Sequence, residues 1–449
     1  MPDPTALEEI ASPVAIGKPP PRLWPMATVM ATGIFATTFV QLQGLGYLPF
    51  NHLFKQMGMD SDKAATFFSL SMLPWTLKII AGLLVDSVPI FGSRRRMYLM
   101  LSALLGSVMW LLMALSAGNY SHLLILAIGM NAAVVLGSTA SGGILVEAGQ
   151  TFGASGRLSS LRVFAQNLGA CLGQPVGGLI ATYLAAYLLG WTSIAAIVPL
   201  ACMFFAAWFL LKEPKLAKDS RLKGNFAAES LRVTFSFGRQ IKNVLRWEIL
   251  VPVLLVFFIQ AVPTFRSTCF YQYQTGPLKY SDAAVGWLGS VGNGVALLSS
   301  GVYALCCRKI PLRISLYAAI ILTYLSAIPY LFYTSSLPQA IAIEAVGTFL
   351  QYLAYLPIFD LIVRSTPKGS EALGYALLIS VWNVGLMIGT KIGPTLYEHW
   401  LNKDMNSLIW LNAGITLAGI VLVFLLPKKF VNQSEGTPFA PAGPAATTA

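Results

Sequence analysis

Apolar residues fall into long runs along this chain, with short polar turns between them. A helix that crosses a bilayer needs about 20 mostly apolar residues. Twelve runs meet that length, with approximate extents 25–47, 64–85, 97–115, 121–147, 158–186, 190–211, 248–271, 283–305, 314–333, 337–363, 372–397 and 407–426. Most exceed the length of about 18 residues that separates spanning helices from buried helices of a soluble enzyme. The pattern predicts an all-α polytopic membrane protein with twelve transmembrane helices.

A long polar segment divides the twelve runs six and six. It predicts an N-terminal half, 25–211, a basic linker, 212–247, and a C-terminal half, 248–426. The first 24 residues contain acidic side chains and no apolar stretch, so they predict a cytoplasmic segment rather than a signal peptide. The tail, 427–449, ends in a Pro- and Ala-rich sequence that cannot bury a core, and we expect it to be disordered.

Composition supports a membrane protein, and the charges indicate its orientation. Of the 449 residues 56% are hydrophobic and only 11% are charged, with a formal net charge of +12. With a cytoplasmic amino terminus, 22 of the 30 basic residues fall on the cytoplasmic side and four on the other. The positive-inside rule therefore predicts that both termini are cytoplasmic, in what we expect to be a bacterial inner membrane. Since the basic excess follows topology, we expect no nucleic-acid partner.

An internal repeat links the two halves. The sequence NLGACLGQPVG at Asn167–Gly177 and the sequence NVGLMIGTKIG at Asn383–Gly393 share an asparagine and three glycines in register. At 100° per residue, Asn167 and Gln174 lie on one helix face, and Asn383 and Lys391 on the matching face of the second copy. The glycines lie on a different face, free for close contact with another helix. Two such halves suggest a transporter that moves around a polar cavity.

The segment LPWTLKIIAGLLVDSVPIFGSRRRMYL, Leu73–Leu99, carries a family resemblance. With twelve helices and a basic central linker the chain resembles the major facilitator superfamily. This segment, together with LVE at Leu145–Glu147, resembles the folate-biopterin transporter family. Acidic residues precede the end of helix four in that family, whereas this chain has Ser138 and Gly142 there. Permeases for siderophores or peptidoglycan fragments, which have a similar helix-two lysine, are therefore the alternative.

Charged residues inside the apolar runs are candidates for substrate binding or coupling. A charge at the centre of a membrane helix costs at least about 2.5 kcal/mol on insertion scales. Lys78 shares a helix face with Trp75 and is expected to contact substrate or a carboxylate, the alternative being a lysine that reaches the headgroups. Arg266, Glu344 and Lys391 lie at a common depth. Either they form an anion-binding or proton-linked site in which Glu344 pairs with Lys391 or Arg266, or they form a structural ion pair.

Polar side chains elsewhere in the runs complete the substrate or coupling candidates. Amides beside aromatic rings suit a flat heterocycle, although each residue alone is as compatible with a structural role. The candidates of this kind are Asn131, Asn167, Gln174, Asn293, Gln351 and Asn383.

A second set of charges lies at the predicted cytoplasmic ends of the helices. The superfamily resemblance implies that Asp86 braces against the positive amino end of helix eleven and closes an inner gate. Glu147 and Arg162 flank one short connection and could pair. Asp360 and Arg364 have the i, i+4 spacing of a helical ion pair. The gating candidates are Asp86, Arg94, Arg95, Arg96, Glu147, Arg157, Arg162, Asp360 and Arg364; a solvated charge run is the alternative.

Enzyme signatures are absent from the sequence: it has no HExxH, GxxxxGK[ST] or GxSxG, and its five cysteines show no CxxC spacing. We therefore expect no enzyme, no cofactor and no metal. Without an ATP-binding loop, transport must follow a gradient. The hypothesis is a secondary transporter that imports a small organic solute, such as a folate- or pterin-like anion, with protons. We expect the solute, protons and the bilayer as partners, and a monomer. A channel or a non-transporting assembly factor is the alternative of another class.

Overall fold

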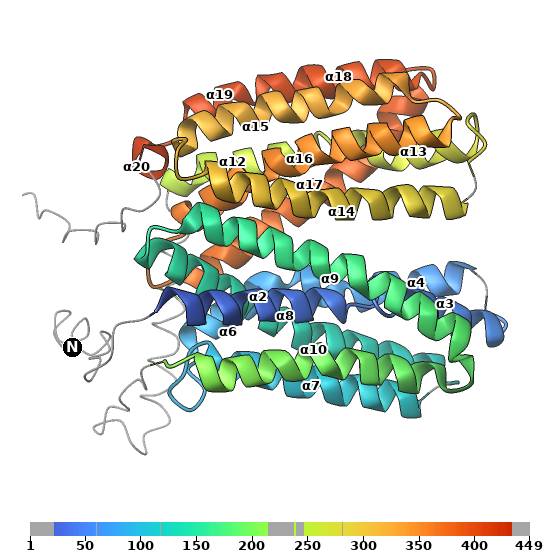
Figure 1. Ribbon diagram of the computed structural model, residues 1–449, viewed down its shortest axis with the longest axis vertical. Helices are drawn as coiled ribbons and strands as arrows, with labels where there is room; N and C mark the ends of the chain where they lie inside the picture. The colour runs from blue at the N-terminus through green and yellow to red at the C-terminus, as the bar shows by residue number, and fades with distance from the viewer. Residues whose placement is uncertain are drawn as a thin grey trace, which may run out of the picture. The chain divides into compact units, whose positions relative to one another are not determined.

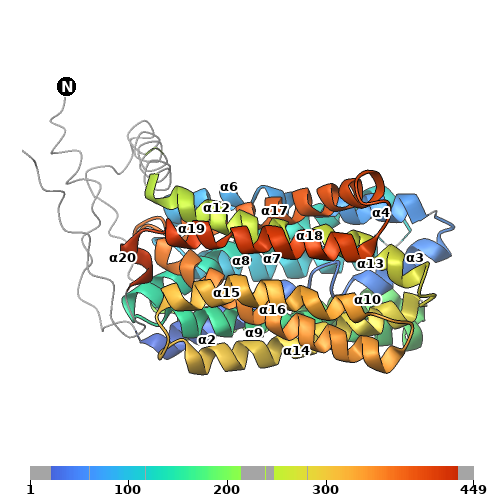
Figure 2. The same cartoon turned by 90° about the horizontal axis from the view of Figure 1, so that it is seen from above.

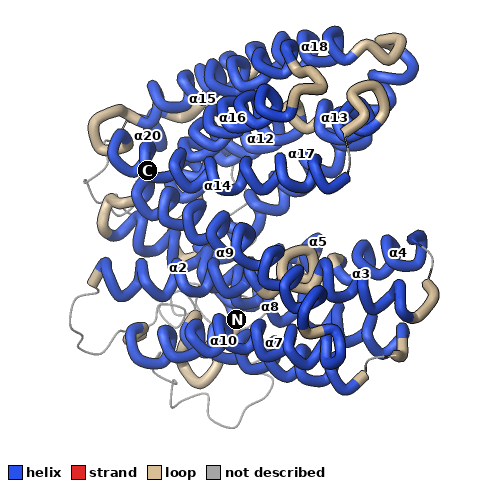
Figure 3. The backbone as a smooth tube through the Cα atoms, turned by 45° about the vertical axis from the view of Figure 1, so that its right-hand side comes forward, coloured by secondary structure: helices blue, strands red, loops and turns tan. Residues whose placement is uncertain are grey.

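The computed structural model describes residues 22–59, 61–116, 118–213, 247–280 and 282–432, together with Gly238. Within these ranges the chain is built from helices joined by turns and short loops, as the ribbons in Figure 1 and Figure 2 and the tube in Figure 3 show. The isolated antiparallel bridge between Ile90 and Ser93 belongs to no strand. The predicted all-α fold class is confirmed.

The element order follows the predicted apolar runs. Up to residue 210 the elements are α2 (Leu23–Phe39), α3 (Tyr47–Gln56), α4 (Ser61–Ser71), α5 (Leu73–Thr76), α6 (Lys78–Ser87), α7 (Arg96–Leu115), α8 (Tyr120–Thr151), α9 (Ser155–Tyr183), the 3-10 helix η1 (Ala185–Tyr187) and α10 (Leu188–Leu210). Beyond residue 246 they are α12 (Trp247–Ala261), α13 (Phe265–Thr275), α14 (Asp282–Cys306), α15 (Leu312–Ala327), η3 (Ile328–Phe332), α16 (Leu337–Ser365), α17 (Glu371–His399), α18 (Met405–Ala418), α19 (Ile420–Phe424) and α20 (Lys428–Val431).

Eight helical spans in the described part of the chain are long and apolar enough to cross a membrane. They are Arg96–Leu115, Tyr120–Thr151, Ala185–Leu210, Trp287–Cys306, Leu312–Phe332, Leu337–Ser365, Glu371–His399 and Met405–Phe424. The four remaining apolar runs lie on α2 with α3, on α4 to α6, on α9, and on α12 with α13. Each predicted run therefore lies on helices, as a twelve-helix architecture requires.

Several of the predicted runs are interrupted rather than continuous, among them the first, the second and the seventh. The first breaks in a turn at residues 40–46, the second at Met72 and again at Leu77, and the seventh at residues 262–264. Pro74 and Pro263 lie just after or within two of these breaks. Proline has no N–H and its ring clashes with the preceding turn, which favours an interruption at these two places, although α9 and α17 continue through Pro175 and Pro394. The second break makes Lys78 the first residue of α6.

The chain divides into two compact units that do not follow the order of the sequence. The first unit contains Met1–Ile144, Phe164–Leu250 and Thr366–Val384. In it α10 packs along α7 and also contacts α2 (Figure 1). The amino-terminal part of α17 belongs to this unit, where Gly82 of α6 lies against the backbone of Leu373.

The second unit contains Leu145–Val163, Val251–Ser365 and Gly385–Ala449. In it α16 packs against α14 and α15, and α15 packs against α18. Asp404 caps α18 by accepting hydrogen bonds from the backbone N–H groups of Asn406 and Ser407. The Ser407 hydroxyl also donates to this carboxylate, and these bonds hold the pKa of Asp404 below its usual value.

Glycines of the internal repeat pack against backbone carbonyls in the same way in both copies. In the first unit, a Cβ on Gly169, Gly173 or Gly177 of α9 would meet the carbonyl oxygens of Phe35, Phe39 and Leu45. In the second unit, a Cβ on Gly385, Gly389 or Gly393 of α17 would meet those of Phe257, Ala261 and Phe265. The expected close-contact face is confirmed: α9 lies on α2 and its turn, and α17 lies on α12 and the start of α13.

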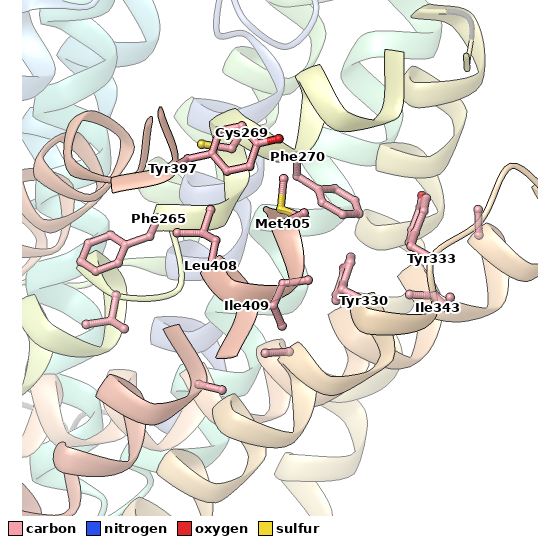
Figure 4. Close-up of a cluster of buried hydrophobic side chains, with 14 of the residues drawn as sticks. Phe265, Cys269, Phe270, Tyr330, Tyr333, Ile343, Tyr397, Met405, Leu408 and Ile409 are labelled. Carbon is pink, nitrogen blue, oxygen red and sulfur yellow. The ribbon is translucent and has the colours of Figure 1, made fainter. Parts of the chain in front are cut away.

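An apolar cluster of the second unit gathers side chains from α13, α14, η3, α16, α17, α18 and the end of α15. Figure 4 shows Phe265 and Cys269 near Leu408 and Tyr397, with Phe270 close to Tyr330. Tyr330, Tyr333 and Phe270 pack ring against ring, with centroids 4.8–6.0 Å apart. This cluster supports the polar network described below.

Parts of three predicted segments lie outside the described residues. These are positions 1–21 of the N-terminal segment, positions 214–237 and 239–246 of the linker, and positions 433–449 of the tail.

Candidate functional site

Lys78 is buried in the first unit and is surrounded by aromatic and hydroxyl groups. Its side chain belongs to a residue that is only 2% exposed. Its Nζ donates to Ser138 Oγ of α8 at 2.9 Å. The same Nζ lies 5.2 Å from the ring centroid of Trp75 and 5.6 Å from that of Tyr375. Both distances lie within the reach of a cation–π interaction.

The neighbours of Lys78 are held by their own contacts. Trp75 donates from Nε1 to Asn131 Oδ1 at 2.9 Å, and the fully buried Asn131 donates to the carbonyl of Ala127. Gly142 leaves room for the ring of Tyr375, since a Cβ there would collide with that ring. We call Lys78, Trp75, Ser138, Asn131 and Tyr375 the lysine site.

Of the two helix-four positions at which the family resemblance led us to expect acidic residues, Ser138 is part of the lysine site and Gly142 lies next to it. Ser138 accepts from Lys78, and Gly142 makes room for Tyr375. A neutral hydroxyl and two rings can orient an ammonium without neutralising it. The Nζ of Lys78 thus has a hydroxyl and two aromatic rings among its neighbours.

Asp86 makes the contact that the sequence led us to expect of it. Its Oδ2 accepts from the backbone N–H of Leu373, in the first turn of α17, at 2.7 Å. A carboxylate is favourable there because the amino end of a helix is electropositive. Arg95 lies beside both acids of this cluster, with Nη2 3.7 Å from Asp86 and 3.1 Å from Glu371. We call Asp86, Arg95 and Glu371, with the first turn of α17, the brace.

Glu213 supports the brace and was missed by the sequence analysis. Its carboxylate accepts from Ser93 Oγ at 2.5 Å, from the backbone N–H of Arg94 at 3.0 Å and from that of Arg95 at 3.0 Å. These N–H groups precede α7, where no residue of the same helix can accept them. The available signal was an acid directly after helix six, between Lys212 and Lys215.

The neighbouring arginines differ in their surroundings. The guanidinium of Arg96 lies 5.1 Å from the ring centroid of Trp208, whereas Arg94 contributes its backbone N–H to Glu213. Arg95 reaches the acids of the brace, Asp86 and Glu371. Gly143 gives it space, because a Cβ there would lie 2.6 Å from Arg95 Nε.

Asp360 and Arg364 form the predicted i, i+4 ion pair in the second unit. Arg364 Nε lies 2.8 Å from Asp360 Oδ1 and 3.1 Å from Ser155 Oγ, at the start of α9. The Arg162 guanidinium lies 4.0 Å from the ring centroid of Phe359. Each unit thus ties the first turn of a long helix to charged side chains of another helix.

The other gating candidates, Glu147 of α8 and Arg157 of α9, are both half-buried in the second unit. Their predicted gating role, and the pairing of Glu147 with Arg162, stay predictions.

Glu344 does not form the ion pair that we expected. It accepts from Tyr330 at 2.8 Å and from Tyr333 at 3.2 Å, and no ion pair joins it to Arg266 or Lys391 within the described residues. Lys391 is exposed. The similar depths read from the sequence were insufficient, because the direction of a side chain around its helix axis decides its neighbours.

The remaining candidates do not share one surface. Asn167 is buried, but Gln174 is exposed and donates to the backbone carbonyl of Gln43 in the turn after α2. The substrate-binding role expected of the helix face that these two residues share stays a prediction. Gln351 accepts from Ser326 at 3.0 Å. Asn293 and Asn383 are half-buried on α14 and α17.

Comparisons with known proteins place the chain in a family. Residues 43–438 match the model of the BT1 family. The chain is 29% identical over 387 residues to the folate-biopterin transporter of Synechocystis sp., covering 82% of this chain and 74% of that one. It is 25% identical over 382 residues to folate transporter 1 of Plasmodium falciparum, covering 79% and 70%.

Solved structures share the fold. The proton:xylose symporter XylE of the major facilitator superfamily matches with a TM-score of 0.64 at 15% identity, over 90% of this chain and 96% of that one. The human organic anion transporter MFSD10 matches with the same TM-score and identity, over 90% and 100%. The expected superfamily fold is confirmed. The chain belongs to the BT1 family and is a multi-pass membrane transporter, not an enzyme.

Proposed function

We propose that this protein is an alternating-access importer of a folate- or pterin-like solute, driven by protons. The observation that carries this proposal is the lysine site, where a buried ammonium lies over the rings of Trp75 and Tyr375. Aromatic faces suit a flat heterocycle, and the ammonium suits an anion. The names of the relatives from Synechocystis and Plasmodium support the same substrate class.

The brace is the proposed inner gate of this transport cycle. The two six-helix halves, 25–211 and 248–426, are the proposed moving bodies. The hydrogen bond from Leu373 to Asp86 joins α17 of one half to α6 of the other. Such a contact must break whenever these two helices separate. The ion pair of Asp360 with Arg364, next to Ser155, is the proposed counterpart.

Both termini and the basic linker are proposed to be cytoplasmic, in a bacterial inner membrane. The support is the distribution of Lys and Arg, with 22 of 30 on one side of the predicted helices. The proposed functional form is a monomer, because a single chain contains both halves and so supplies all twelve helices.

Uptake into proteoliposomes tests the proposed function. Vesicles containing the full chain are loaded with buffer, given radiolabelled folate or biopterin outside, and compared with and without an inward proton gradient. Saturable accumulation that the gradient increases is the expected result. Equal accumulation in the two conditions would overturn proton coupling. A lack of uptake and of exchange for both solutes would overturn the substrate class, and siderophores and muropeptides then become the test solutes.

The variant Lys78→Ala tests the role of the lysine site. A lost charge-assisted contact of about 1.5–3 kcal/mol corresponds to about tenfold or more in transport efficiency. Lys55→Ala, at an exposed lysine, is the matched control. Both variants should insert and elute from a sizing column like the wild type. Unchanged uptake by Lys78→Ala would remove the lysine site from the mechanism, and conductance without saturation would favour a channel.

A further inference from the structure

Arg266 of α13 has an environment that is unusual for an arginine inside a membrane helix. Its guanidinium carbon lies 3.4 Å from the ring centroid of Tyr330 and 5.5 Å from that of Phe270. Its Nη1 is buried and has no hydrogen-bond partner in the described residues. At such a short distance the planar group lies against the tyrosine face, so its N–H bonds point sideways from the ring. A planar fork of donors is therefore presented to whatever lies beside Tyr330.

Tyr330 is held in place on several sides. Its hydroxyl donates to Glu344 Oε2 at 2.8 Å, and its ring is parallel to that of Tyr333, with centroids 6.0 Å apart. A Cβ on Gly347 would lie 2.5 Å from the ring, so the ring can occupy this position only because residue 347 is a glycine. The ring is thus a fixed platform for Arg266.

Glu344 is held as firmly as the platform. Tyr333 donates to Glu344 Oε1 at 3.2 Å, and Gln274 in turn donates to the hydroxyl of Tyr333 at 2.8 Å. Two phenol groups therefore satisfy one oxygen each of the carboxylate. The acid stabilises the platform without pairing directly with the guanidinium, which keeps its positive charge and its donors.

A buried donor without an acceptor is unfavourable, and a ligand that supplies the acceptor removes that cost. The geometric partner of a guanidinium fork is a carboxylate, which accepts two parallel N–H bonds in the plane of the group. A neutral heterocycle offers no such pair of anionic oxygens. The ligand chemistry of this site is consequently different from that of the aromatic faces at the lysine site.

We propose that Arg266 binds a carboxylate of the transported solute and that Tyr330 and Glu344 position it. This inference rests on the proposed function and narrows its substrate class to an aromatic or heteroaromatic solute that carries a carboxylate. Folate has that group, whereas biopterin lacks it. Arg266 is then a specificity-determining residue, and Tyr330 and Glu344 are positioning residues.

Equilibrium binding to the purified full chain, with three ligands, tests the inference. Folate contains both the pterin ring and carboxylates, biopterin only the ring system, and p-aminobenzoylglutamate only the carboxylates. Arg266→Gln should weaken the binding of folate and of p-aminobenzoylglutamate by at least about tenfold and change the binding of biopterin by no more than about twofold. Arg266→Lys keeps the charge but loses the fork, so its affinity for the two carboxylate ligands should lie between that of the wild type and that of Arg266→Gln. Arg308→Gln, at an exposed arginine, is the matched control.

Tyr330→Phe keeps the ring and removes the hydrogen bond to Glu344. It should weaken the binding of the two carboxylate ligands by a few fold and leave biopterin binding unchanged. A general loss of folding would reduce biopterin binding as well. Equal losses for all three ligands in Arg266→Gln, or no loss for folate, would overturn the inference.

The wild type separates failure of the inference from failure of the proposed function. Wild-type binding of biopterin but neither carboxylate would overturn the inference alone. Binding of p-aminobenzoylglutamate without either pterin, lost in Arg266→Gln, would overturn only the proposed substrate. A wild type that binds none of the three would overturn both.

Discussion

Glu213 is a single side chain that holds a loop distant from it in the sequence, the one before α7. Its two carboxylate oxygens accept from a hydroxyl and two backbone N–H groups that lie nearly 120 positions earlier in the sequence. Hydrogen bonds to a charged acceptor are stronger than neutral ones. Because Arg95 is one of the bonded residues and also contacts Asp86, Glu213 indirectly orients the brace.

The variant Glu213→Ala should therefore destabilise the protein and loosen the brace. We expect a loss of about 1–2 kcal/mol, because two backbone donors before α7 would lose their acceptor. Thermal unfolding of the detergent-purified protein should show a lower midpoint than for Lys212→Ala, its exposed neighbour. Glu213→Gln, with one acceptor oxygen left, should lie between them. Equal midpoints for Glu213→Ala and Lys212→Ala would contradict the role of this carboxylate.

At the scale of whole elements, glycine spacing decides which helices can approach each other. The glycines of α9 and α17 recur every four residues, so they form a stripe along one face. Each stripe lies on the carbonyls of a helix that is interrupted by a turn, either α2 before α3 or α12 before α13. Glycine is required at these positions, because the carbonyl groups that a Cβ would meet belong to the backbone and cannot move aside as a flexible side chain can.

Replacing Gly393 by alanine should be costly, whereas the same change at Gly414 should not. A Cβ on Gly393 would meet the backbone of Phe265, while nothing lies within 4 Å of one on Gly414 of α18. Overpacking of this kind typically costs about 1–3 kcal/mol, and alanine at an open helix position is favourable by up to about 1 kcal/mol. Thermal midpoints measured side by side should fall for the first variant and stay or rise for the second. The opposite order would show that α17 does not pack as described.

For the molecule as a whole, the conformational equilibrium depends on contacts such as the brace. Asp86 accepts from the first turn of α17 and is adjacent to Arg95, so its charge interacts with a helix end and a guanidinium together. The α6–α17 contact beside it is close, with Gly82 lying against Ala376 and Leu373. If the brace is the inner gate, loss of one carboxylate shifts the whole cycle towards the state in which α6 and α17 are apart.

Asp86→Ala should therefore increase the accessibility of the contact between α6 and α17. In a background in which the five native cysteines are replaced, Ala376→Cys would be labelled with a membrane-impermeant maleimide. We expect labelling about tenfold faster with Asp86→Ala than without it, because a charge-assisted hydrogen bond of roughly 1.5 kcal/mol is lost. Asp86→Asn, which keeps an acceptor for Leu373, should have a smaller effect. Equal rates in all three proteins would exclude Asp86 from the gate.

Much of the architecture follows from local physics along the chain. A bilayer requires long apolar helices, so the twelve runs could be predicted from composition and hydropathy. The transporter class followed from the internal repeat and the family resemblance. Glycines four residues apart share a helix face, so a close contact with some other helix followed from that spacing, whereas the structure shows the partners to be α2 and α12. The contact of Asp86 with the start of α17 was predictable because the resemblance to the major facilitator superfamily implied it.

Which side chains meet was decided by the tertiary structure. Glu344 bonds to Tyr330 and Tyr333 rather than to Lys391 or Arg266. The position of a residue in an apolar run indicates its depth along the helix, but it does not indicate which neighbouring helix its side chain faces. Glu213 reaches Arg95 only because the chain returns there after four further helices. The sequence alone determined that this protein spans a membrane and carries buried charges. Packing between distant segments determined what each of those charges touches.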